Sequence, residues 1–278
     1  MATITAQQVN DLRKATNAGM MDCKNALVEA NGDFETAIDI LRKKGQKIAA
    51  KREDRDANEG VILAKTAEDA KFGVVVCLNC ETDFVAKNES FIGLVETITN
   101  IALKNKINTP EELLSLGFDS DMTIKDKLIE QTGVIGEKLE ISKAFSLSGE
   151  RVVAYNHPGN RLATLVSLNK SDVTFDEPAR QVAMQVAAMN PIALDKDGVS
   201  QEIIDREIEI GKELAINEGK PAEMAEKIAQ GRLGKFFKEN TLLSQEFIRD
   251  NKLTVEQFLK TVDKDLTATG FQRIGLGN

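Results

Sequence analysis

The chain has 278 residues, a length that suits two or three domains with a hydrophobic core between them. Of its residues 42% are hydrophobic and 29% charged, which is ordinary for a soluble protein. Its 44 acidic residues outnumber its 36 basic ones, and the net charge of −8 argues against a general nucleic-acid binder that works by neutralising phosphates. No apolar run could span a bilayer, and no apolar segment follows a basic start, so we expect a cytoplasmic protein without membrane contact.

Side chains that perform covalent or metal chemistry are sparse. Cys23, Cys77 and Cys80 are too few for a disulfide scaffold, and no phosphate-binding glycine motif is present. Cys77 and Cys80 have the C-x-x-C spacing of a redox pair or half a zinc site, yet no second Cys or His pair exists to complete a tetrahedral site. We therefore expect buried, reduced thiols, no metal, no cofactor and no catalytic residue; an enzyme using the cysteines or an acidic pair is the alternative.

Residues 1–54 predict a three-helix head followed by a basic linker. Thr5 and Gln8 have the spacing of a capping box, and Asp22 and Asp33 can cap two further helices. Such a bundle is barely large enough to fold alone.

The first loop of this head places Met20 beside Met21 at a helix junction. Two interpretations stay open: the methionines fill the core, or they form a soft, adaptable docking surface. Only one of two adjacent side chains can easily face inward.

The segment 42–60 is highly charged and is typical of a solvated helix end plus linker. RNA contact through Arg42 to Arg55 is a minority interpretation, because acidic residues interrupt the basic ones.

From residue 60 onward the chain repeats itself. VVCLN at 75–79 is matched by LVSLN at 165–169, and each ends a predicted hairpin that is followed by an amphipathic helix. A further helix and strand complete each copy. We predict a duplicated α+β core with small antiparallel sheets, one copy at 55–148 and the other at 149–192 with 239–278.

The second copy is interrupted by an insertion at 193–238, predicted to be a helical hairpin or short coiled coil that projects as an arm. Gly219 fits the end of one helix and Pro221 the first turn of the next. The predicted apolar seam consists of Ile204, Ile208, Leu214, Met224, Ile228 and Leu233.

The connection between a predicted strand and the following helix contains an acidic residue next to an aromatic one, Asp83 and Phe84. Turns normally run over the surface and take small polar residues. The Phe84 ring therefore either folds back into the core or is displayed for a partner.

Two motifs, TDFVAKN at 82–88 and GMMDCKNAL at 19–27, together with the module order and the duplicated core, resemble bacterial translation elongation factor Ts. The resemblance covers nearly the whole chain. It implies a ubiquitin-associated-like head and a guanine-nucleotide exchange factor that binds elongation factor Tu in its GDP-bound form, loosens GDP and Mg²⁺, and leaves the nucleotide-free partner when GTP enters. An RNA-binding or general protein-interaction module without exchange activity is the alternative.

The resemblance also implies which residues contact this partner. We expect no direct contact with nucleic acid. Phe84 would wedge between side chains of the partner near the partner's Mg²⁺ site. Many family members continue into a C-terminal helix that also touches the partner, whereas this chain stops at Asn278, which leaves that contact open. A homodimer through the arm is a further expectation. The implied contact residues are Leu12, Arg13, Met20, Met21 and Lys24 in the head, Thr82, Asp83, Phe84 and Val85 in the motif, and Ile135 and His157.

Overall fold

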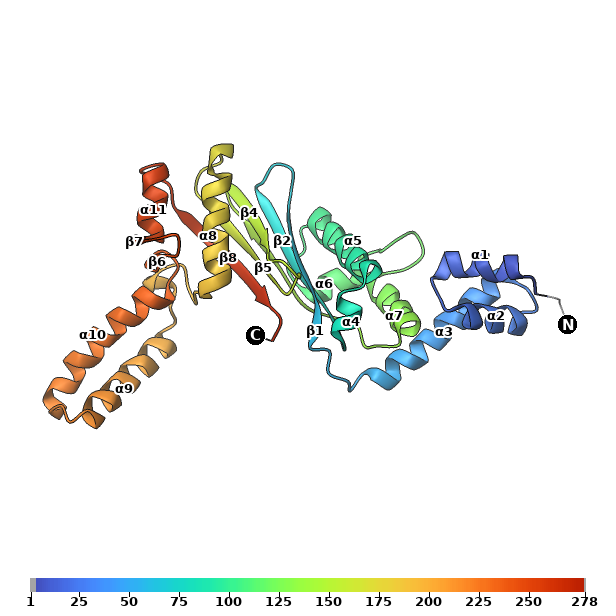
Figure 1. Cartoon of the computed structure of the whole chain (residues 1–278), viewed down its shortest axis with the longest axis horizontal. Helices are drawn as coiled ribbons and strands as arrows, with labels where there is room; N and C mark the ends of the chain where they lie inside the picture. Colours follow the sequence, from blue (N-terminus) through green and yellow to red (C-terminus); the bar gives the residue numbers. More distant parts are fainter. Residues whose placement is uncertain (1–3, 278) are drawn as a thin grey trace. The chain divides into compact units, whose positions relative to one another are not determined.

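The computed structural model describes residues 4–277, which form a mixed α+β chain, as predicted (Figure 1). Asn278, where the sequence stops, lies outside them. Two compact units are present: one comprises the chain up to Leu63, Val76–Phe145 and the end from Ile274, and the other comprises Ala64–Val75 and Ser146–Arg273. No helix within the described residues is long and apolar enough to cross a membrane.

Three helices form the head at the start of the first unit: α1 (Ala6–Thr16), α2 (Met20–Glu29) and α3 (Phe34–Arg52). The predicted capping box of Thr5 and Gln8 starts α1, and Asp33 caps α3 by accepting from the Thr36 N–H at 2.8 Å. The prediction that Asp22 caps α2 is wrong, because that helix already begins after Gly19. Asp22 lies in the first turn, where its charge complements the helix dipole. The head core consists of Val9, Leu12, Ala18, Cys23, Ala26, Leu27, Ala30 and Ala37.

The third helix is longer than the sequence indicated, because α3 continues to Arg52 through residues predicted to be partly linker. It packs on α7 (Ile124–Ile135) at a crossing of two glycines, Gly45 and Gly133. A Cβ added to Gly133 would lie 2.5 Å from the Cα of Gly45, closer than real Cβ atoms come to atoms of residues distant in the chain. The two helix backbones therefore touch with no side chain between them.

The two copies of the predicted repeat have the same strand order. One sheet runs in the order β1 (Glu59–Thr66), β2 (Phe72–Cys80), β3 (Glu140–Ser148), and the other in the order β4 (Arg151–Asn156), β5 (Leu162–Leu168), β8 (Ala268–Gly275). The last strand of each copy therefore pairs with the second. Thr123 and Thr254 each open a capping box, at the starts of α7 and α11 (Val255–Val262). Thr82 and Asp172 each cap the short turn of helix that follows the second strand of its copy. The predicted duplication is thus confirmed.

The remaining elements follow in chain order. Between the head and α7 lie β1 (Glu59–Thr66), β2 (Phe72–Cys80), α4 (Asp83–Ala86), α5 (Glu89–Asn105) and α6 (Pro110–Ser115). After α7 come β3 (Glu140–Ser148), β4 (Arg151–Asn156), β5 (Leu162–Leu168), η1 (Val173–Phe175), α8 (Asp176–Met189), η2 (Lys196–Gly198), α9 (Gln201–Asn217), α10 (Ala222–Asn240), β6 (Glu246–Phe247), β7 (Asp250–Thr254) and β8 (Ala268–Gly275).

The core of the second unit forms where α8, α11 and the strands β5 and β8 bury apolar side chains together. Strand β4 pairs antiparallel with β5, from Arg151 opposite Leu168 to Asn156 opposite Ala163. The buried cluster consists of Val166, Leu168, Phe175, Ala179, Val182, Ala183, Val186, Leu242, Phe247, Val255, Leu259, Leu266 and Ala268.

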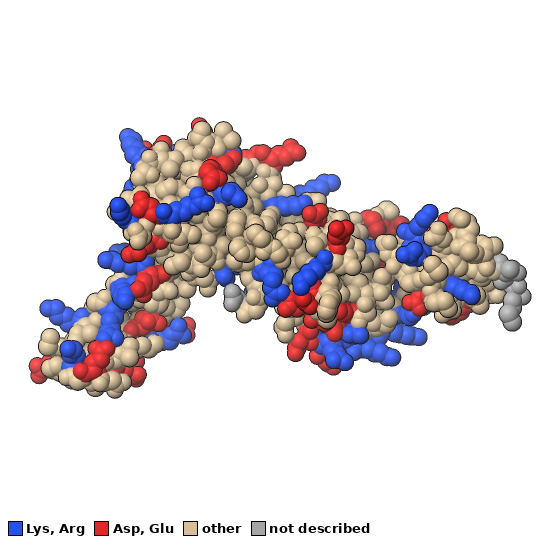
Figure 2. Space-filling view, in the orientation of Figure 1, with Lys and Arg blue, Asp and Glu red and all other residues tan. Residues whose placement is uncertain are grey.

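The predicted helical hairpin is present as α9 and α10, with Gly219 at φ +76° between them. Its seam differs from the prediction, because Leu214 and Met224 are exposed. Gly211 packs directly against Ala229, so the helices approach too closely for large side chains. The buried seam residues are Gly211, Ala215, Ala225, Ala229 and Leu233, with Ile204, Ile208 and Ile228 half-buried. Charges of both signs are mixed along the visible face of the arm (Figure 2). Two ion pairs join its helices, Lys212 to Glu226 and Arg232 to Glu218.

Candidate functional site

The turn that carries Phe84 follows β2 directly. Its helix, α4, has four residues, and the Thr82 hydroxyl caps it by accepting from the Val85 N–H at 3.4 Å. Phe84 is 83% exposed, whereas Phe91, seven residues later on α5, is 1% exposed. The Phe84 ring therefore does not fold back into the core, and the core interpretation of this residue is wrong.

The neighbour of the ring, Asp83, forms an ion pair with Lys87 at 2.6 Å, four residues along the chain. The hydrogen bond from Lys87 lowers the pKa of Asp83, so this carboxylate is charged at neutral pH. An exposed ring thus stands between a fixed negative charge and Val85, which is half-buried.

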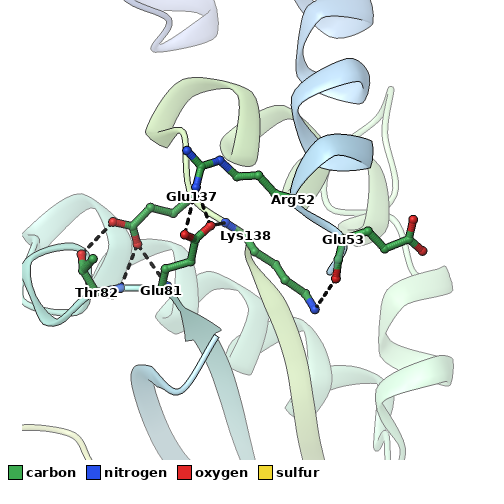
Figure 3. Close-up of polar contacts among 6 residues, drawn as sticks. All are labelled: Arg52, Glu53, Glu81, Thr82, Glu137 and Lys138. Carbon is green, nitrogen blue, oxygen red and sulfur yellow. Dashed lines mark hydrogen bonds and ion pairs between the residues drawn. The ribbon is translucent and has the colours of Figure 1, made fainter. Parts of the chain in front are cut away.

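A single carboxylate, that of Glu137, holds the start of this turn (Figure 3). One Glu137 oxygen accepts from the backbone N–H groups of Glu81 at 3.1 Å and Thr82 at 3.0 Å, and the other accepts from the Thr82 hydroxyl at 2.7 Å. Hydrogen bonds to a charged acceptor are stronger than neutral ones. Glu137 follows α7 after one intervening residue, so the bonds tie the end of α7 to the start of α4.

A second set of bonds joins the same place to the end of α3 (Figure 3). Arg52 donates to both oxygens of Glu81, at 2.8 and 2.9 Å, and the Lys138 N–H donates to one of them at 2.6 Å. Lys138 also donates through Nζ to the carbonyl of Glu53 at 3.0 Å. The last turn of the head's longest helix is therefore fastened to the residue just before the Phe84 turn.

The protonation of Glu81 follows from these bonds. Burial alone would raise the pKa of this carboxyl, but the hydrogen bonds from Lys138 and Arg52 outweigh burial and lower it below its usual range. A lowered folded-state pKa means that the bonds stabilise the fold at neutral pH and that this contribution is lost as the pH falls through the folded-state value.

In the head, both methionines of the first loop are exposed, Met20 by 61% and Met21 by 63%. Arg13 and Lys24 are exposed as well. This favours the docking-surface interpretation of the methionines over core filling. Leu12, by contrast, is fully buried in the head core, so its side chain does not reach the surface.

Ile135 is the last residue of α7 and is half-buried, two residues before Glu137. The remaining predicted contact residue, His157, belongs to the second unit and is exposed in the turn between β4 and β5. Its Nδ1 lies 2.9 Å from the Tyr155 hydroxyl, which holds the imidazole ring.

Arg52, Glu81 and Glu137 were not found by sequence reasoning. Glu137 contacts residues more than fifty positions earlier in the chain, and no local spacing singles it out among 44 acidic side chains.

All three cysteines are buried and unpaired. Burial raises the pKa of Cys77 and Cys23, and burial together with the Glu137 carboxylate raises that of Cys80 to about 12. Protonated thiols are poor nucleophiles and poor metal ligands. No group of three or more His, Cys, Asp or Glu side chains that could hold a metal ion occurs among the described residues.

The basic segment considered for RNA contact is partly neutralised within the fold. Arg52 is paired with Glu81, Lys44 with Asp22, and Gly45 is buried against α7. These contacts leave a mixed surface rather than a continuous basic stripe, which argues against RNA contact through this segment.

Comparison with known proteins gives concordant matches. A family model described as "Elongation factor TS" matches residues 81–278. Curated proteins named "Elongation factor Ts" are similar over nearly their full length: that of Christiangramia forsetii is 53% identical, with all of both chains covered, and that of Porphyromonas gingivalis is 50% identical, with 98% of each covered. The protein of that name from Cytophaga hutchinsonii is 49% identical, over 99% of this chain and all of the other.

Proposed function

Because this chain belongs to the elongation factor Ts family and is accordingly a guanine-nucleotide exchange factor for elongation factor Tu, we propose that it works by inserting Phe84 into its partner. The head, residues 1–54, docks on the partner's nucleotide-binding domain through Met20, Met21, Arg13 and Lys24. Leu12 supports that surface from beneath.

The observation that carries this proposal is an aromatic ring that is 83% exposed on a turn with several anchoring hydrogen bonds. An exchange factor must bind the nucleotide-free partner more tightly than the nucleotide-bound one, because only a difference in affinity shifts an equilibrium, and the coupling is reciprocal. A ring that fills a gap present only after GDP and Mg²⁺ have loosened supplies such a difference.

Asp83, Thr82, Val85, Ile135 and His157 complete the proposed contacts. Asp83 presents a charge beside the ring, and His157 adds a contact from the second unit. The chain itself performs no bond-breaking chemistry in this proposal and works in the cytoplasm, where translation takes place. It binds both the GDP-bound and the nucleotide-free partner, with no direct contact to nucleic acid.

The direct test is the release of a fluorescent GDP analogue from elongation factor Tu. In the presence of excess GTP, catalytic amounts of the chain should accelerate the release of the GDP analogue. One molecule of the chain should act on many molecules of elongation factor Tu in turn. An unchanged rate of release would overturn the proposal, and binding to elongation factor Tu without acceleration would favour a general interaction module.

A variant with both Met20→Asp and Met21→Asp tests the head. Burying a methionine is worth about 1.5 to 3 kcal/mol, and about 1.4 kcal/mol is tenfold in an equilibrium constant. We therefore expect the variant to bind elongation factor Tu at least about tenfold more weakly, with an unchanged circular dichroism spectrum. Leu12→Asp is the control: a charge buried in the head core should reduce helicity. Loss of helicity in the methionine variant would instead make these residues structural.

In the absence of its partner, the protein is proposed to form a homodimer through the arm, where the apolar side chains of Ile210, Leu214 and Met224 are exposed. Deleting residues 199–237 and bridging with a short Gly/Ser loop should leave a folded core. The flanks already meet: the Ile192 N–H donates to the Asn240 carbonyl and the Leu242 N–H to the Ala193 carbonyl, each at 2.9 Å. Light scattering should show a smaller assembly after deletion, whereas a monomer in both cases would refute the dimer.

A further inference from the structure

We propose that Glu137 is a positioning residue for exchange, which acts by fixing the turn that presents Phe84. The inference rests on the proposed function of Phe84 as an inserted ring, and it assigns a role to a side chain outside the contact motif.

The ring has no packing of its own to hold it, because it is 83% exposed. The helix that carries it has four residues, too few to be stable without external contacts. The position of the ring therefore depends on how the start of this helix is anchored.

Glu137 supplies that anchor directly. Its two carboxylate oxygens accept from two consecutive backbone N–H groups, of Glu81 and Thr82, and from the Thr82 hydroxyl, all within 3.1 Å. The same hydroxyl accepts from the Val85 N–H, so it links the carboxylate to the residue just beyond the ring. Removing the carboxylate would leave all three donors without this acceptor and free the first residues of the turn.

The contact between Arg52 and Glu81 is a different kind of tether. It holds the side chain of Glu81 and reaches the turn only through that residue. It explains why the turn should stay near its place when Glu137 is lost, with greater freedom rather than a new fold. Ordering a free turn would then be part of the binding step, and such ordering costs affinity without any lost contact.

The test is a double-mutant cycle of Glu137→Ala and Phe84→Ala, with affinity for nucleotide-free elongation factor Tu as the readout. Glu137→Ala alone should weaken binding by roughly two- to tenfold, the cost of ordering a side chain and its turn on binding. In the Phe84→Ala background the same change should weaken it by less than about twofold, because residues that act through one another are not additive.

Two further variants separate positioning from general destabilisation. Glu137→Gln should bind nucleotide-free elongation factor Tu with wild-type affinity. Its amide oxygen can accept from both N–H groups, and its amide NH₂ can donate to the Thr82 hydroxyl. Glu140→Ala removes a nearby exposed carboxylate whose ion pair is with Lys138, and it should leave affinity unchanged. Amide hydrogen exchange at Glu81 and Thr82 should accelerate in Glu137→Ala and not in Glu140→Ala.

Two outcomes would refute the positioning role of Glu137 and leave the inserted-ring proposal standing. One is an equal loss of affinity from Glu137→Ala with and without Phe84, and the other is wild-type exchange protection of the Thr82 amide in Glu137→Ala. If Phe84→Ala itself binds normally, the inserted-ring proposal fails and this inference with it. Should Glu137→Ala not fold, the cycle run with Glu137→Gln must show full affinity, and a loss that persists without Phe84 would refute the positioning role.

Discussion

Replacing Phe84 by alanine is expected to weaken binding to nucleotide-free elongation factor Tu by roughly ten- to a hundredfold while leaving the melting temperature almost unchanged. The reason is that burying a phenylalanine is worth about 1.5 to 3 kcal/mol. That burial takes place in the partner and not in this chain, where the ring is already exposed to water. Affinity measured by titration and thermal unfolding followed by circular dichroism provide the two readouts.

The matched control is Phe91→Ala, the same substitution at a fully buried ring on the next helix. Truncating a buried phenylalanine typically costs about 3 to 5 kcal/mol of stability. This variant should therefore melt at a clearly lower temperature and, where it is still folded, accelerate exchange normally per folded molecule. If Phe84→Ala behaved like this control, the ring would be structural and the inserted-ring proposal would be wrong. Asp83→Ala should lose less affinity than Phe84→Ala, because an exposed polar contact is worth less than a buried ring.

The second large effect is expected at the crossing of α3 and α7. Gly133→Ala places a Cβ 2.5 Å from the Cα of Gly45, and backbone cannot move aside as a flexible side chain can. The helices must separate, and overpacking of this kind costs about 1 to 3 kcal/mol. Because α3 carries the head and also ends at Arg52, its displacement should both lower the urea midpoint of unfolding and weaken binding to elongation factor Tu.

Gly93→Ala is the control for this substitution. Gly93 lies inside α5, and a Cβ there meets no atom within 4 Å. Replacing an exposed glycine inside a helix by alanine stabilises by about 0.5 to 1 kcal/mol, so the urea midpoint should rise slightly and the affinity should stay the same. An equal rise for Gly133→Ala would mean that the two helices do not pack through their backbones.

Much of this architecture could be predicted because its signals are local. Capping boxes, the repeated strand and helix pattern, and the glycine between α9 and α10 depend on residues close together in sequence. Local signals alone left the Phe84 ring open between the core and the surface, and only the resemblance of the TDFVAKN motif to elongation factor Ts favoured the surface, where the ring lies.

Features that depend on close approach between distant segments were missed. The seam of the arm was predicted through Leu214 and Met224, since large apolar residues usually mark an interface. Gly211 and Ala229 bring the helices too close for that. No local signal marks Gly45 as a contact, yet it is the point at which α3 touches α7. Charge made the following residues look like a linker, and the contacts of Arg52 lie in a part of the chain about thirty residues away.

The two capped turns after β2 and β5 place their aromatic rings differently. Thr82 and Asp172 cap equivalent turns, but the aromatic residue is the second after the cap in one copy, Phe84, and the third in the other, Phe175. That shift of one position separates a ring in water from a ring in the core of its unit. Phe175 therefore stabilises the core of the second unit, whereas Phe84 leaves the core of the first unit untouched. A substitution at Phe175 should cost stability, and one at Phe84 should cost recognition alone.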